Sequence, residues 1–103
     1  MSLQNFRAFQ MAKELYKETK KLRLTLNERD QLERAALSIA TNLAEGSGKT
    51  GKDRSRYFAI AMGSLREVQG LLEITGQRRE LVLLAECLGG RTYRLQRNPG
   101  KGP

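Results

Sequence analysis

The side chains that could carry out chemistry in this chain are carboxylates, hydroxyls and a single thiol, because histidine is absent. Without histidine, no Ser-His or Cys-His pair can activate a nucleophile. A lone cysteine, Cys87, excludes a disulfide framework and any zinc site built from Cys and His within one chain. The sequence therefore predicts a protein that is not an enzyme and that holds no metal or cofactor, and no small-molecule substrate is indicated.

Two glutamates, Glu45 and Glu67, form an acid pair that would suit a metal ion or general acid–base chemistry. Such a site also needs a nucleophile or a third ligand, and none stands out. We favour a structural polar network, in which Glu67 pairs with Arg34 because an unpaired, partly buried charge is costly. Asn42 and Glu45 would cap or pin the loop that follows. The residues of this network are Arg34, Ser38, Asn42, Glu45, Ser64 and Glu67.

A glycine-rich segment, residues 46–52, invites comparison with a phosphate-binding P-loop. The P-loop pattern needs a strand before it, a helix after it, and a Ser or Thr directly after the lysine. Here a predicted helix precedes the segment, and Asp53 follows Lys52. We therefore do not expect nucleotide binding. The segment is either a solvated connection or a place where backbone amides and basic side chains meet phosphate groups.

Positive charge is the strongest compositional signal, with 19 Lys and Arg against 11 acidic residues and a net charge of +8. Such an excess favours polyanionic partners, nucleic acid first and an acidic membrane surface second. Three tyrosines are scattered along the chain, so contacts to phosphates are expected rather than base stacking. Two alternatives are a surface that is charged for solubility alone and one that meets an acidic protein. The candidate nucleic-acid-binding residues are Lys13, Lys17, Lys20, Lys21, Lys49, Lys52, Arg54, Arg56, Arg91 and Arg94.

Apolar residues recur at helical spacing in four segments, which predicts helices over residues 8–24, 28–45, 54–75 and 80–97. The expected N-caps are Asn5, Asn27, and Asp53 or Ser55. Glycines 89 and 90 should interrupt the fourth helix. Short connections favour an all-α, antiparallel up-down-up-down four-helix bundle as a single domain, 1–97, with a disordered tail, 98–103. An extended helical array that buries its faces only on oligomerising is the alternative.

Neither a membrane-spanning apolar run nor a secretory signal is visible, and the lone cysteine suits a reducing compartment. We therefore expect a cytoplasmic protein without a membrane partner.

Small residues gather on one face of the third predicted helix, at Ala59, Gly63 and Gly70. Two interior glycines cost a helix about 2 kcal/mol relative to alanine. Close approach of another helix is the usual compensation. That helix would lie either within the bundle or in a neighbouring subunit.

Residues 34–46, RAALSIATNLAEG, and residues 57–67, YFAIAMGSLRE, carry a specific pattern. It resembles the bacterial four-helix-bundle family found as open reading frames inside intervening sequences of 23S ribosomal RNA genes. The resemblance extends over about residues 5–95. It implies a cyclic homopentamer of antiparallel bundles. The related accessory proteins of diversity-generating retroelements further imply binding to RNA and to a reverse transcriptase.

The sequence and the resemblance together predict a non-enzymatic, basic four-helix bundle that forms a homo-oligomer, expected to be a pentamer, and binds RNA or DNA. The alternative is a structural adaptor that binds a protein partner, such as a reverse transcriptase, without touching nucleic acid itself.

Overall fold

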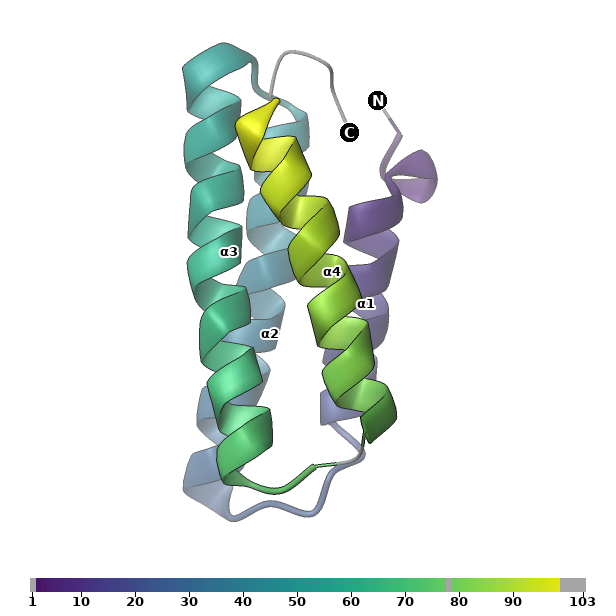
Figure 1. The fold of residues 1–103 in the computed structure, drawn as a ribbon, viewed down its shortest axis with the longest axis vertical. Coiled ribbons are helices and arrows are strands. Elements are labelled where there is room, and N and C mark those ends of the chain that lie inside the picture. Colours follow the sequence, from purple (N-terminus) through teal and green to yellow (C-terminus); the bar gives the residue numbers. More distant parts are fainter. Residues whose placement is uncertain (1, 78, 99–103) are drawn as a thin grey trace.

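The computed structural model describes residues 2–77 and 79–98. These residues form a short 3-10 turn, Leu3–Asn5, and four α-helices: α1 (Arg7–Thr19), α2 (Leu26–Ser47), α3 (Gly51–Ile74) and α4 (Arg79–Arg97). No strand occurs among the described residues, and the helices pack side by side (Figure 1). The prediction of an all-α four-helix bundle is confirmed.

Each helix lies beside two others, because α2 contacts α1 and α3 while α4 contacts α3 and α1. In Figure 1 the chain follows α1, returns along α2, and repeats this with α3 and α4. A hydrogen bond of 3.0 Å from Ser55 Oγ to the Gln96 carbonyl joins the start of α3 to the end of α4. The bundle measures 40 × 20 × 18 Å.

The core is built from the apolar rows that the sequence predicts. Leu15 of α1, Ile39 of α2, Leu65 of α3 and Leu88 of α4 are all completely buried. Burying a side chain of this size stabilises a fold by about 1.5–3 kcal/mol. Every helix therefore depends on the other three to cover its apolar face.

The first helix is shorter than predicted, since α1 ends at Thr19 rather than at residue 24. The Thr19 hydroxyl donates to the Tyr16 carbonyl at 2.7 Å, and the next two amides bond in a tighter i to i−3 pattern. Arg29 then holds the connection by donating to the carbonyls of Lys20 and Leu22. The expected cap Asn5 lies in the 3-10 turn, and Phe6 occupies the N-cap without a side-chain bond.

The second helix starts at Leu26, two residues before the predicted start, because Thr25 and Glu28 form a capping box. Thr25 Oγ1 accepts from the Glu28 amide at 3.2 Å, and the Glu28 carboxylate accepts from the Thr25 amide at 3.0 Å. The predicted cap Asn27 therefore lies inside the helix. A residue that satisfies two amides competes well with one that satisfies a single amide.

Replacing Thr25 with alanine removes one half of this capping box. We expect the free energy of unfolding to fall by about 1 kcal/mol, as for other N-cap threonines. Urea denaturation followed by circular dichroism measures the change. Asn27→Ala is the matched control, and an equal loss in both variants would contradict the assignment of the cap.

The third helix begins earlier than predicted, at Gly51, where φ is +54°. Thr50 is its N-cap but makes no side-chain capping bond. The expected caps serve other partners: the Asp53 carboxylate accepts from Arg56, and Ser55 bonds to α4.

The fourth helix runs without a break through Gly89 and Gly90. A Cβ atom at Gly89 would lie 3.2 Å from Leu65 Cδ2, so this glycine lets α3 approach closely and the expected interruption is wrong. Of the predicted tail, Asn98 donates from its amide to the Arg94 carbonyl, and residues 99–103 lie outside the described chain. No helix among the described residues is long and apolar enough to cross a bilayer.

Candidate nucleic-acid interface

One end of the bundle carries most of the excess positive charge. This loop end comprises residues 2–10, 44–60 and 93–98, which include the α2–α3 loop and the last turn of α4 (Figure 1). It holds seven basic and two acidic residues, whereas the rest of the described chain holds ten basic and nine acidic residues. The basic residues of the loop end are Arg7, Lys49, Lys52, Arg54, Arg56, Arg94 and Arg97, and the acidic ones are Glu45 and Asp53.

Tyr57 lies at the centre of the charged side chains that the α2–α3 loop contributes. The Arg56 guanidinium lies 4.7 Å and the Lys49 ammonium 5.9 Å from the centroid of its ring. Lys49 Nζ also lies 3.6 Å from Glu45, and Arg56 donates to Asp53 at 2.8 Å. The bond to Asp53 raises the pKa of the Arg56 guanidinium, so this side chain keeps its charge.

Arg54 has a structural role, although the sequence groups it with the nucleic-acid-binding residues. Its side chain donates to the carbonyls of Gly46 and Ser47 at 3.2 and 3.1 Å, where α2 ends. These carbonyls have no later helical amide to bond, so the guanidinium satisfies them. Arg54 therefore shapes the loop that presents Lys49 and Lys52.

The structure brings the end of α4 to the loop. Because Ser55 bonds to Gln96, the exposed side chain of Arg94 and that of Arg97 lie at the same end of the bundle as Lys52. Arg97 is absent from the predicted set, although its spacing of three residues from Arg94 places both near one face of a helix. Arg91, which was predicted, is half-buried and lies one turn further from the loop end.

The basic cluster on α1 does not join the loop end. Lys20 Nζ lies 3.3 Å from Glu33, and Lys21 Nζ lies 2.8 Å from Glu18. Hydrogen bonds to the Tyr16 side chain and to Glu33 raise the pKa of Lys20. The remaining predicted residues of this cluster, Lys13 and Lys17, line an α1 surface that they share with Glu14 and Glu18. Acidic neighbours thus offset the charge of α1.

The structure joins only part of the predicted polar network. Ser38 Oγ and Ser64 Oγ lie 2.7 Å apart across α2 and α3, and Asn42 Nδ2 donates to the Ser38 carbonyl at 2.8 Å. Asn42 therefore bonds within α2 and not to the following loop. Glu45 does contact that loop through Lys49.

The predicted ion pair between Arg34 and Glu67 is wrong. Arg34 Nη2 lies 2.9 Å from Asp30, one turn back on α2, and Glu67 is exposed on α3. An exposed carboxylate is hydrated by water, so it needs no buried cation. Glu67 also lies away from Glu45, beside the Ser38–Ser64 contact, so the structure does not bring the two glutamates together. No group of three or more residues with metal-binding side chains occurs in the described chain.

The small residues of α3 do not contact another helix of the bundle. Ala59, Gly63 and Gly70 are all exposed, and a Cβ atom at either glycine would meet nothing within 4 Å. Close packing within the bundle, one of the two predicted explanations, is therefore wrong. The tight approach occurs instead at Gly46 of α2, where a Cβ atom would lie 2.7 Å from Phe58 Cε1.

The fold and the charge distribution define a small all-helical bundle with one basic end. The chain belongs to the 23S rRNA-intervening sequence protein family, whose model matches residues 5–82. The match covers all of α1, α2 and α3 and only the start of α4. No curated protein and no solved structure matches the chain.

Proposed function

We propose that this protein is a non-enzymatic RNA-binding bundle that acts in the cytosol and contacts RNA through its loop end. The observation that carries the proposal is the uneven charge, with seven basic residues against two acidic ones at the loop end and near balance elsewhere. Closely spaced cations attract a polyphosphate chain most strongly where no acidic residues offset them. Membership of a family named for ribosomal RNA genes supports RNA over DNA.

Contacts at the loop end would be made to phosphates rather than to bases. Lys52 and Arg94 are exposed and flank the loop from different helices, so together they can follow a phosphate backbone. The Tyr57 ring is half-buried and already faces Arg56, which leaves it poorly placed to stack on a base. Binding through phosphates discriminates weakly between sequences.

Self-association is the second part of the proposal. It is supported by the exposed small residues of α3 and by exposed apolar side chains such as Ile74, which is 78% exposed. The family resemblance implies five copies. Light scattering combined with gel filtration measures the number directly.

The salt dependence of RNA binding tests the proposal. Phosphate contacts release counterions, so the affinity for a mixed-sequence, single-stranded RNA should fall roughly 10- to 100-fold from about 50 to about 150 mM salt. Fluorescence anisotropy with labelled RNA and with DNA of the same sequence measures this change. No binding at about 50 mM salt would contradict the proposal and favour an adaptor that contacts a protein partner, such as a reverse transcriptase.

A further inference from the structure

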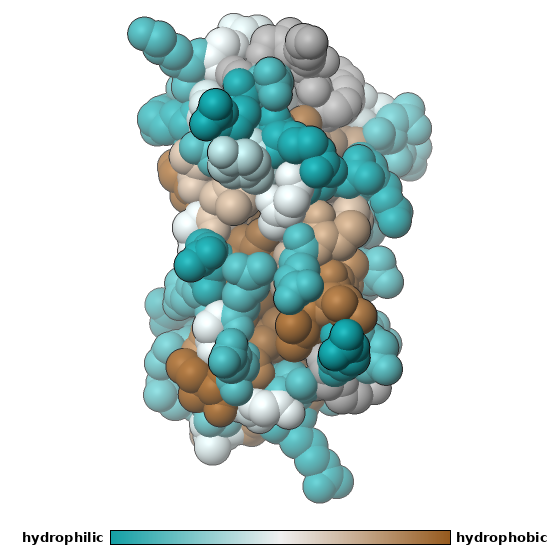
Figure 2. Space-filling view, viewed as in Figure 1, coloured by the Kyte–Doolittle hydropathy of each residue, from teal (hydrophilic) through white to brown (hydrophobic). Residues whose placement is uncertain are grey.

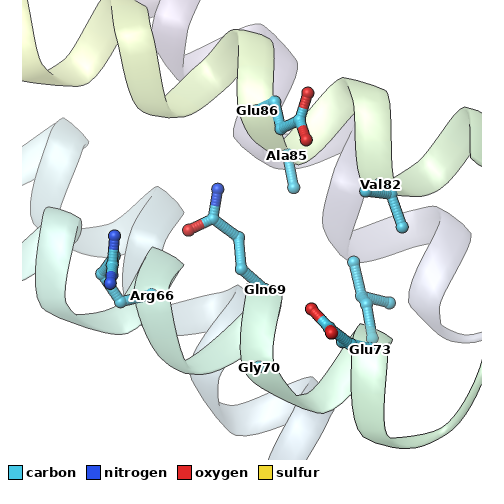
Figure 3. Close-up of a pocket in the computed structure, with 8 residues that line it drawn as sticks. Arg66, Gln69, Gly70, Glu73, Val82, Ala85 and Glu86 are labelled. Atoms are coloured by element: carbon cyan, nitrogen blue, oxygen red, sulfur yellow. The ribbon is translucent and has the colours of Figure 1, made fainter.

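A groove of about 540 Å³ lies between α3 and α4, on the side of the bundle shown in Figure 3. Gln69 and Glu73 extend from α3 toward α4 in this view. Val82, Ala85 and Glu86 line the opposite wall. The groove is therefore open to solvent and combines apolar and charged side chains.

Three charged residues of the groove have no opposite charge within the described chain. Arg66 and Glu73 belong to α3 and Glu86 belongs to α4, and all three are exposed. No ion pair or hydrogen bond is formed by any of these side chains among the described residues. Most other exposed charges on the bundle pair at short helical spacing, as Arg34 does with Asp30.

The groove also has the features of a surface that another helix covers. Gly70 lies between the charged residues in the middle of a helix, and a Cβ atom there would meet nothing within 4 Å. Ile74 and Leu83, which adjoin groove residues in sequence, are 78% and 47% exposed. Figure 2 shows apolar side chains gathered on this face, in the half away from the loop end.

The spacing of the charges identifies the occupant. Arg66 and Glu73 are seven residues apart, which is two helical turns, so they lie on one stripe of α3 with Gly70 between them. When two such helices cross in antiparallel fashion about a two-fold axis beside Gly70, each Arg66 lies opposite the partner subunit's Glu73. A two-fold contact needs a self-complementary surface of this kind.

We propose that the α3–α4 groove docks α3 of a second copy of this chain, with Arg66 of each copy between Glu73 and Glu86 of the partner subunit. Gly70 allows the two α3 helices to approach closely at the centre of the contact. This inference rests on the self-association in the proposed function. A two-fold contact joins copies in pairs, so it gives an even number of subunits and differs from the pentamer that the resemblance implies.

A charge-swap experiment on the full chain tests the contact. Arg66→Glu and Glu73→Arg, made singly, each place like charges opposite one another and should raise the dissociation constant of the pair about 100-fold. The double variant restores opposite charges and should return the constant to within about threefold of the starting protein. Arg23→Glu, an exposed residue far from the groove, is the control for the change in net charge and should have no effect. Sedimentation over a concentration series measures the association.

The outcomes separate this contact from the rest of the proposal. An assembly of pairs that the single variants dissociate and the double variant restores supports the contact. A five-copy assembly overturns the two-fold contact but leaves self-association standing, because a closed ring of five has no two-fold contact between neighbours. A monomer at all concentrations overturns both, whereas RNA binding is decided separately by the salt series.

Discussion

Replacing Phe58 with alanine is expected to lower the free energy of unfolding by about 3–5 kcal/mol. The Phe58 side chain is completely buried, and its ring centroid lies 6.2 Å from that of Phe6. It also fills the space beside Gly46, where α2 and α3 approach most closely. A cavity here cannot be closed by a neighbouring side chain at Gly46, so little of the loss is recovered.

Urea denaturation followed by circular dichroism measures the Phe58 effect. Small domains have a total stability of about 5–15 kcal/mol, so the variant is expected to be partly unfolded at 37 °C. Ile60→Ala is the matched control, because Ile60 lies two residues away on the same helix but is 43% exposed. The control should change stability by less than about 1 kcal/mol. Equal losses in the two variants would contradict the position assigned to Phe58 in the core.

Reversing three charges at the loop end should weaken RNA binding about 100-fold or more at physiological salt. The variant combines Lys52→Glu, Arg56→Glu and Arg94→Glu, and spares Arg54, which holds the loop through the carbonyls of Gly46 and Ser47. Loss of three phosphate contacts should also make the plot of log affinity against log salt shallower by about 2 units for single-stranded RNA. Anisotropy titrations at several salt concentrations measure both quantities.

The control carries the same change in net charge on α1 and the connection that follows it. Lys13→Glu, Lys17→Glu and Arg23→Glu alter exposed residues outside the loop end. Because these positions lie among acidic side chains or far from the loop, the combined variant should lose less than about tenfold in affinity. If both triple variants lose affinity equally, RNA responds to the total charge and the loop end is not the interface.

The helices could be predicted from the sequence because their apolar rows are unbroken. The row of Leu32, Ala36, Ile39 and Leu43 repeats at helical spacing, and all four residues are buried in the core. The chain ends of the helices were less predictable, since they depend on competition between local bonds. Thr25 displaced Asn27 as the cap because its position lets Glu28 complete a reciprocal pair of bonds.

The candidate interface could be predicted only in part, because the net charge of a surface depends on which helices meet. The sequence separates Lys52 from Arg94 by forty-two residues, and only the packing of α3 against α4 brings them to one end. The lysines of α1 have the same spacing as a binding cluster, but Glu33 of another helix neutralises Lys20. Likewise, the sequence placed Glu67 beside Arg34, whereas Asp30 on the same helix lies nearer to that guanidinium.

The alternation of helix directions has a consequence for the electric field above the loop end. Two helices begin there, α1 and α3, and two end there, α2 and α4 (Figure 1). The partial positive charges of the two helix starts and the partial negative charges of the two helix ends therefore largely cancel. The field that reaches an approaching anion comes from ammonium and guanidinium groups alone, so acetylation of the lysines in that field would weaken it without changing the backbone.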